Sequence, residues 1–189
     1  MRYAIGVIKL QEISLNILDV AENGVKAGAT LVSITVDEQP DQDLLTVIIE
    51  DNGCGMTEEQ LQQVTDPFFT SRTTRKVGLG IPLIKMAAEM TGGTLTIGST
   101  VGVGTKVTAR FGYHHIDRMP LGNTVDTITA LVQCNPHMDF VYTRVHGDKT
   151  FVMDTREFRA VLGDDISLAE PEVVQYIRAF LDEGEQSVI

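Results

Sequence analysis

The segment Asp51-Asn-Gly-Cys-Gly-Met56 constrains the fold more than any other part of this 189-residue chain. It follows directly on the apolar run Leu44–Glu50, which is typical of a buried strand. A strand cannot continue through the two glycines, which turn the backbone sharply or bring it close to a ligand. Asp-Asn-Gly is also common in ordinary turns, so the segment alone is a weak signal. It predicts a strand end at which the Asp51 carboxylate can accept a hydrogen bond from an adenine amino group.

Hydrophobic periodicity along the rest of the chain predicts an α+β fold. The expected helices cover residues 12–27, 57–64, 79–90, 123–132, 154–162 and a last segment from about Pro171 to a stop at Gly184. The expected strands cover residues 31–37, 44–50, 94–99, 105–111, 140–145 and 150–153. The character of the sequence changes after Gly112, which predicts two domains, one of residues 1–112 and a small α+β domain of residues 113–189.

The charge balance excludes some classes of partner. The chain has 15 basic and 26 acidic residues, a net charge of −11, whereas binding to nucleic acid or an anionic membrane needs clustered positive charge. We therefore expect neither nucleic acid nor a membrane as a partner. No run approaches the roughly 20 apolar residues of a membrane span. The apolar stretch of residues 3–8 is shorter than the core of a signal peptide, so we expect a cytoplasmic protein.

The first expected helix carries three polar residues on one face. Asp19, Asn23 and Lys26 stand at i, i+4 and i+7 and therefore share that face. The amide oxygen of Asn23 can ligate Mg²⁺, Lys26 can reach a phosphate, and Asp19 can orient or deprotonate a water molecule. A solvated polar face explains the same pattern, so the helix alone leaves both interpretations open.

Two further segments can contact a phosphate or a purine. The first runs from Asp66-Pro-Phe-Phe-Thr-Ser-Arg72 through Lys76 to Gly78-Leu-Gly80, where a helix begins. Backbone amides at a helix start favour phosphate, and the basic residues of this segment would lie over the same anion. Its two phenylalanines can equally be core residues. The second segment, Gly102-Val-Gly-Thr105, is typical of a hairpin turn whose threonine hydroxyl can support a polar group in a purine pocket.

Taken in order, these segments resemble the N box and the glycine boxes of the GHKL superfamily, over about residues 10–112. That superfamily joins type II topoisomerases, a heat-shock chaperone family, histidine kinases and mismatch-repair ATPases. The resemblance implies a Bergerat fold, a two-layer α/β sandwich of a mixed sheet with helices on one face, which binds ATP with Mg²⁺. It also implies Asn23 as the metal ligand, Asp19 as the catalytic residue, and residues 65–77 as an ATP lid. The residues that it implies for ATP binding are Asn23, Lys26, Asp51, Gly53, Gly55, Met56, Phe68, Thr70, Arg72, Gly78, Leu79, Gly80 and Thr105.

Within the superfamily, the order of the boxes resembles the histidine-kinase branch most closely. Pro67-Phe-Phe-Thr70, Gly78-Leu-Gly-Ile81 and Ser99-x-x-Gly-x-Gly-Thr105 follow the order of a kinase catalytic domain. Ala27-Gly-Ala-Thr30 and Asp51-Asn-Gly-Cys-Gly-Met56 instead resemble the mismatch-repair ATPases. The long loop and the Gly-Glu-Ala pattern that those ATPases carry later are absent from the sequence.

Three features depart from the superfamily pattern. The hydrolytic members have a glutamate at the position of Asp19, and an aspartate is one methylene shorter, which puts water activation in doubt. Lys76-Val-Gly78 stands where kinases often have an extra glycine, which predicts a stiffer lid hinge. Only about 12 residues stand before the first expected helix, so we expect no helix pair with a phosphoacceptor histidine ahead of the domain, and we interpret His114-His115 as a linker.

Three classes of function remain open from the sequence. The protein can be a phosphotransferase that acts on a partner protein, an ATPase or ATP-gated switch, or a nucleotide-binding module without catalysis. The kinase-like lid and the appended C-terminal residues favour phosphoryl transfer to a partner protein, with that C-terminal part as the partner surface.

Overall fold

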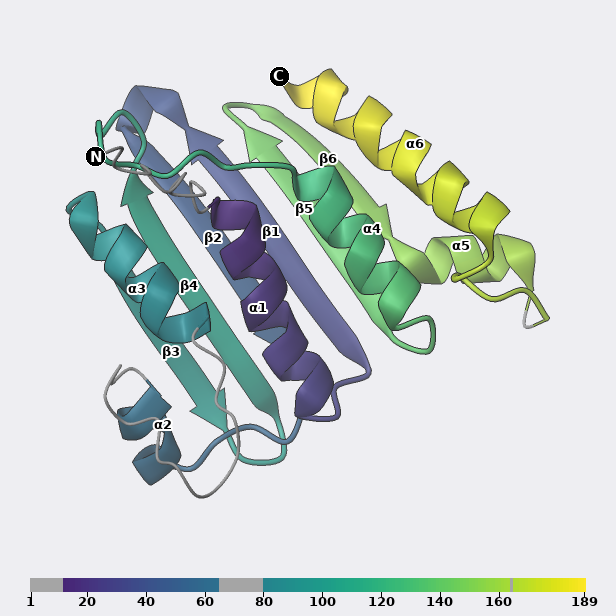
Figure 1. Ribbon diagram of the computed structural model, residues 1–189, viewed down its shortest axis with the longest axis horizontal. Coiled ribbons are helices and arrows are strands. Elements are labelled where there is room, and N and C mark those ends of the chain that lie inside the picture. Colours follow the sequence, from purple (N-terminus) through teal and green to yellow (C-terminus); the bar gives the residue numbers. More distant parts are fainter. Residues whose placement is uncertain (1–11, 65–79, 164) are drawn as a thin grey trace, which may run out of the picture.

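The computed structural model describes residues 12–64, 80–163 and 165–189, whose helices and strands Figure 1 labels. The helices are α1 (Ile13–Lys26), α2 (Glu58–Val64), α3 (Gly80–Met90), α4 (Thr124–Cys134), α5 (Thr155–Leu162) and α6 (Pro171–Val188). The strands are β1 (Leu31–Gln39), β2 (Leu44–Asp51), β3 (Thr94–Thr100), β4 (Gly104–Gly112), β5 (Asp139–His146) and β6 (Lys149–Asp154). A short 3-10 helix, η1 (Pro40–Gln42), connects β1 to β2. The fold is α+β, as the sequence predicts.

One mixed sheet contains these strands in the order β3-β4-β2-β1-β5-β6. β1 lies near its centre, antiparallel to β2 and parallel to β5. Successive side chains of a strand point to opposite faces, and in β1 Val32, Ile34 and Val36 are buried on one face. The alternation that predicts a strand at residues 31–37 therefore also selects the face of the sheet that the helices cover.

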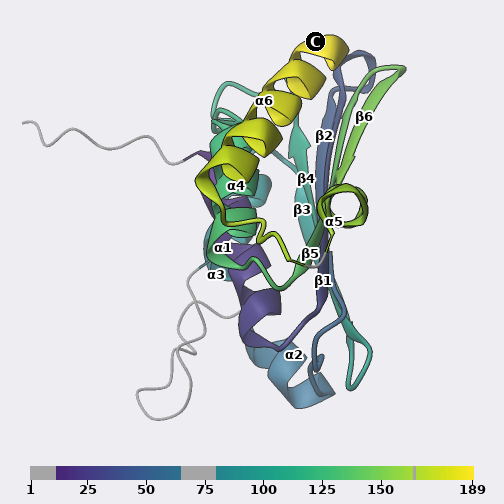
Figure 2. The same cartoon turned by 90° about the vertical axis from the view of Figure 1, so that its right-hand side faces the viewer.

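Helices form the second layer. Figure 2 shows α1, α3, α4 and α6 on one side of the sheet. Ile13, Ile17 and Ala21 of α1 are buried at helical spacing, so the apolar stripe of α1 faces the sheet. α3 and α4 flank α1, as Figure 1 shows. This arrangement confirms the two-layer sandwich that the resemblance to the GHKL superfamily implies.

The residues after Gly112 extend the same sheet. The chain passes from β4 through α4 to β5, which pairs with β1 from Leu31–Asp139 to Glu38–His146. Buried apolar residues of α4, β5, β6 and α6 also belong to one core cluster with those of α1 and β1. The predicted boundary at residues 112 and 113 therefore does not separate two sheets or two cores, because the β1–β5 ladder joins the two parts.

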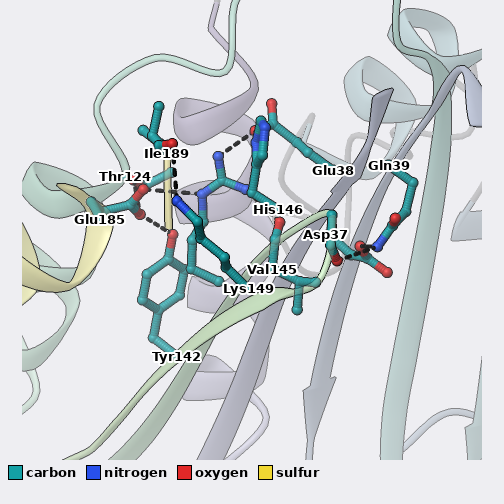
Figure 3. A network of polar contacts seen from close by, with 12 residues as sticks. Asp37, Glu38, Gln39, Thr124, Tyr142, Val145, His146, Lys149, Glu185 and Ile189 are labelled. Carbon is teal, nitrogen blue, oxygen red and sulfur yellow. Dashed lines mark hydrogen bonds and ion pairs between the residues drawn. The ribbon is translucent and has the colours of Figure 1, made fainter. Parts of the chain in front are cut away.

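A buried network of polar side chains joins α6 to the sheet (Figure 3). Arg144 of β5 is only 2% exposed; its guanidinium donates to Glu38 of β1 and, through Nε over 3.0 Å, to Glu185 of α6. Glu185 also accepts hydrogen bonds from the hydroxyls of Tyr142 and Thr124, the latter over 2.7 Å. Burial, and then the Glu185 carboxylate, raise the pKa of Tyr142, which keeps its hydroxyl protonated and able to donate.

The predicted helix stop at Gly184 is wrong, because α6 continues to Val188. Gly184 is buried inside the helix, where an added Cβ would overlap the ring of Phe151 in β6. This glycine is therefore present for close packing of α6 on the sheet, not for ending the helix. Among the helices of the described residues, none combines the length and the apolar content that crossing a membrane requires.

Candidate functional site

The last turns of α1 lie against the end of β2. A Cβ added at Gly24 would come within 2.8 Å of the Cβ of Asp51 and within 3.3 Å of its Oδ2. Side-chain carbon atoms in contact normally stay about 4 Å apart, so a residue larger than glycine would displace the carboxylate. Because Asn23 is the chain neighbour of Gly24, the predicted metal ligand and the predicted adenine contact come from adjoining parts of the structure.

Asp51 is the last residue of β2, and its side chain is half-buried. Its Oδ1 accepts a hydrogen bond of 2.8 Å from the backbone N–H of Gly53. Burial raises the pKa of Asp51; the backbone N–H groups of Gly53 and Thr105 oppose this shift, and the neighbouring Glu50 carboxylate reinforces it. A half-buried carboxyl group with a raised pKa marks a candidate binding site, and the second oxygen of Asp51 can accept a hydrogen bond from a ligand.

The two glycines after Asp51 let the turn pass close to two other parts of the chain. A Cβ added at Gly53 would lie 2.8 Å from the Cβ of Ala27, just after α1. Gly55 has a φ of 65°, and a Cβ there would overlap the carbonyl group of Thr100 at the end of β3. The turn is therefore held between α1 and the β3–β4 hairpin. The predicted contact of these glycines with a purine stays a prediction.

Ser99 connects the remaining described site residues. Its Oγ accepts from the backbone N–H of Met56 over 2.8 Å, donates to the carbonyl oxygen of Gly104 over 3.0 Å, and lies 2.9 Å from Oγ1 of Thr105. Thr105 is in turn the register partner of Asp51 across β4 and β2. The structure thus brings Met56 and Thr105 to the end of the sheet where Asp51 lies. Sequence reasoning assigned no role to Ser99, although its place at the head of the Ser99-x-x-Gly-x-Gly-Thr105 pattern was the available signal.

Asn23 of α1 is half-buried, and its Nδ2 atom is buried without a hydrogen-bond partner among the described residues. A buried polar atom without a partner is costly, and such an atom in a native structure points to a bound group or water. The side-chain amide can also rotate to place its oxygen at the same position. Amide and carboxylate oxygens are ligands that Mg²⁺ prefers. Asn23 therefore fits a magnesium ion that is bound with a nucleotide.

The start of α3 lies against α1 one turn before Asn23. A Cβ added at Gly80 would lie 2.7 Å from the Cβ of Asp19, so these two predicted site residues are in contact. Lys26, in the last turn of α1, instead pairs at 2.9 Å with Glu22, and both side chains are exposed. Exposed ion pairs contribute little to stability, so Lys26 can leave this pair at small cost to reach a phosphate.

The other predicted nucleotide-binding residues lie outside the described residues. They belong to the segment 65–79, together with the predicted ATP lid of residues 65–77, and are Phe68, Thr70, Arg72, Gly78 and Leu79. Their roles stay predictions. The described part of the site therefore consists of α1, the turn after β2, the first residue of α3 and the β3–β4 hairpin.

The fold and this site together define an ATP-binding domain of the GHKL type. The chain belongs to the family described as "Histidine kinase-, DNA gyrase B-, and HSP90-like ATPase", whose model matches residues 7–115. The matched segment contains α1, the turn after β2, the start of α3 and the β3–β4 hairpin, so the family membership and the geometry agree.

Curated relatives are similar over the same part of the chain. Sensor protein SrrB from Staphylococcus aureus strain NCTC 8325 / PS 47 is 36% identical over 102 residues, which are 51% of this chain and 17% of that protein. The protein of the same name from strain COL gives the same values. The chain thus matches less than a fifth of the length of these relatives.

Two solved structures share the fold. The N-terminal domain of a DNA repair protein aligns with a TM-score of 0.55 and 12% identity, over 81% of this chain and 57% of that one. The MutL ATPase domain of Aquifex aeolicus, complexed with ADP, aligns with a TM-score of 0.50 and 16% identity, over 82% of this chain and 70% of that one. Both alignments are longer than the family-matched segment, so the shared fold includes elements beyond residue 115.

Proposed function

We propose that this protein binds Mg·ATP where α1, the turn after β2 and the β3–β4 hairpin meet, and transfers the γ-phosphoryl group to a partner protein. The observation that carries the proposal is the close approach of Gly24 to Asp51. Asn23, whose amide suits Mg²⁺, is the chain neighbour of Gly24, and Asp51 is a half-buried carboxylate suited to a base amino group. A purine nucleotide with a chelated magnesium ion uses both kinds of contact.

Asp51 supplies the selection for adenine in this proposal. Its carboxylate accepts a hydrogen bond from the exocyclic amino group of adenine, and the Thr105 hydroxyl, held by Ser99 at 2.9 Å, supports the same edge of the base. Guanine carries a carbonyl oxygen where adenine carries this amino group. Two acceptors facing each other are unfavourable, so ATP is preferred over GTP.

Asn23 holds the magnesium ion, which when bound supplies charge compensation for the phosphate oxygens. Lys26, Arg72 and the backbone amides near Gly78 and Gly80 hold the phosphates themselves. Phosphoryl transfer depends mainly on the placement of charge around the transferred group. We therefore expect the basic side chains within residues 65–79 to affect the rate of phosphoryl transfer more than any nucleophilic side chain of this chain.

The transfer step is supported by the kinase-like order of the boxes and by the similarity to sensor protein SrrB. In this step an acceptor side chain of the partner attacks the γ-phosphorus, the bond to the bridging oxygen breaks, and ADP leaves. His114 is a poor candidate for an acceptor, because its backbone N–H donates to Asp43 over 2.7 Å and its Nε2 lies 3.1 Å from the carbonyl oxygen of Pro40. These contacts are those of a linker bound to the β1–β2 connection.

The test is phosphate transfer from ATP labelled at the γ position, with the full chain and the proteins that co-purify with it. We expect label on a partner protein with the wild-type chain, and none with Asn23→Ala. Label that appears only as free phosphate, with no labelled protein, would contradict transfer.

An ATPase or ATP-gated switch is the second candidate. The contact of Asp19 with Gly80 places an acidic side chain at the start of α3, and the fold resembles that of the MutL ATPase domain complexed with ADP. For this candidate, free phosphate is released without any partner, and Asp19→Asn stops the release. Phosphate release that is unchanged in Asp19→Asn would exclude Asp19 as the residue that activates water.

A further inference from the structure

The side chain of Asn52 bonds the turn after β2 to the loop after α1. Its Oδ1 accepts hydrogen bonds from the backbone N–H groups of Thr30, over 2.8 Å, and of Leu31, over 3.0 Å. Its Nδ2 donates to the hydroxyl of Thr30 over 2.9 Å. Asn52 is exposed, so water could satisfy the same amide. Because Asn52 is exposed, its three hydrogen bonds add little to stability through burial. Their main effect is to fix the position of the loop relative to the turn after β2.

The loop that Asn52 holds is the segment that ends α1. The backbone N–H of Ala27 donates to the carbonyl oxygen of Asn23 over 2.9 Å, and that of Ala29 donates to Gly24 over 3.1 Å. On the other side, the N–H of Cys54 donates to the carbonyl oxygen of Ala27 over 3.0 Å. Residues 27–31 therefore connect the last turn of α1 directly to the turn that follows Asp51.

The last turn of α1 and the turn after β2 are closely packed at two glycines. A Cβ added at Gly24 would lie 2.8 Å from the Cβ of Asp51, and a Cβ added at Gly53 would lie 2.8 Å from the Cβ of Ala27 and 2.9 Å from Oδ1 of Asp51. Movement of the loop would therefore change the distance between Asn23 and Asp51. A one-ångström error in the placement of such groups has a large effect on a ligand that contacts both.

We propose that Asn52 is a positioning residue that sets the spacing between Asn23 and Asp51, and hence between the metal and the adenine parts of the bound nucleotide. This inference rests on the proposed Mg·ATP site. Adenosine needs only the Asp51 side, whereas Mg·ATP spans both sides. Loss of the Asn52 hydrogen bonds therefore weakens the binding of Mg·ATP and leaves the binding of adenosine almost unchanged.

The test compares the dissociation constants of adenosine and Mg·ATP, measured by calorimetry, for the full wild-type chain and for variants. In Asn52→Ala the constant for Mg·ATP should rise about tenfold, as expected for the loss of aligned hydrogen bonds, while that for adenosine changes less than about twofold. Thr30→Val removes only the bond from Nδ2 and should give a smaller loss in the same direction. Asn52→Asp keeps an oxygen that accepts hydrogen bonds from the backbone N–H groups of Thr30 and Leu31. This variant should therefore retain most of the affinity for Mg·ATP.

A matched control separates positioning from general stability. Asn123 makes a comparable bond at the start of α4, where its Oδ1 accepts from the N–H of Asp126 over 2.9 Å. Asn123→Ala should lower the thermal midpoint without changing the ratio of the two dissociation constants. A ratio that stays at the wild-type value in Asn52→Ala would overturn the positioning role. Absence of Mg·ATP binding by the wild-type chain would instead overturn the proposed function, so the two failures are distinguishable.

Discussion

Gly24 of α1 lies so close to the Asp51 carboxylate of β2 that no other residue fits at position 24 without displacing one of them. This contact joins two segments that are far apart in the sequence and places Asn23 beside the end of the sheet. The proposed binding of Mg²⁺ and adenine in one site depends on this contact. The contact can be tested without any knowledge of the partner protein.

The first prediction concerns this contact directly. Gly24→Ala adds a Cβ that overlaps the Asp51 side chain, so either α1 or the carboxylate must move. We expect a loss of about 1–3 kcal/mol in the free energy of unfolding and a clear loss of ATP affinity, measured by urea denaturation and by calorimetry. Gly98→Ala in β3 is the control, because an added Cβ there meets no atom within 4 Å. Equal ATP affinity in Gly24→Ala and Gly98→Ala would contradict a role of the Gly24–Asp51 contact in ATP binding.

The second prediction concerns the pH dependence of Asp51. Because the folded-state pKa of Asp51 is raised above its ordinary value of 3.8, the folded state binds its proton more tightly than the unfolded state does. The stability from this group is therefore fully present below the unfolded pKa and is lost as the pH rises through the folded pKa. ATP affinity should change in the opposite direction and increase over the same pH window, because only the ionised carboxylate is a full acceptor for the adenine amino group.

The matched variant for the pH prediction is Asp51→Asn. It removes the titrating group and should make both the stability and the ATP affinity flat across that window. It should also weaken ATP binding at neutral pH by about 1.5–3 kcal/mol, the usual contribution of a hydrogen bond to a charged group. Full ATP affinity in Asp51→Asn would reject the adenine-reading role.

The third prediction concerns the network that joins α6 to the sheet. Arg144→Met leaves the buried carboxylate of Glu38 and the half-buried carboxylate of Glu185 without their shared cation, and should destabilise the protein by about 3–5 kcal/mol. Adding Glu38→Gln and Glu185→Gln to the same chain should recover much of that loss, because the unpaired charges are then gone. Urea denaturation of the single and triple variants checks this. If Arg144→Met is as stable as the wild type, the network does not stabilise the packing of α6 on the sheet.

Local patterns in the sequence predicted most of the helices and strands and suggested the residues of the candidate site. The alternation of Val32, Ile34 and Val36 is a property of a single strand, and the glycines around Asp51 mark a turn wherever that strand is placed. The superfamily resemblance then related α1, the turn after β2 and the β3–β4 hairpin to one ligand. Each of these inferences uses residues that are close together in the chain, or the order of motifs that the superfamily shares.

Long-range contacts explain what the sequence did not predict. Glu38 and Arg144 are 106 positions apart, so nothing local to either residue indicates that β5 pairs with β1. Gly184 resembles a helix stop by composition, and only the position of the Phe151 ring shows that it is a packing residue. Asn52 belongs to a conspicuous turn, but its bonds to Thr30 become visible only once β1 and β2 are paired.

Calorimetry of ATP with and without Mg²⁺, on the wild-type chain and on Asn23→Ala, tests most directly whether Asn23 and Asp51 share one nucleotide site. We expect tight binding of Mg·ATP by the wild type, weaker binding of ATP without the metal, and loss of the Mg²⁺ dependence in Asn23→Ala. Mg·ATP affinity that is equal in Asn23→Ala and the wild type would contradict a shared site for Asn23 and Asp51.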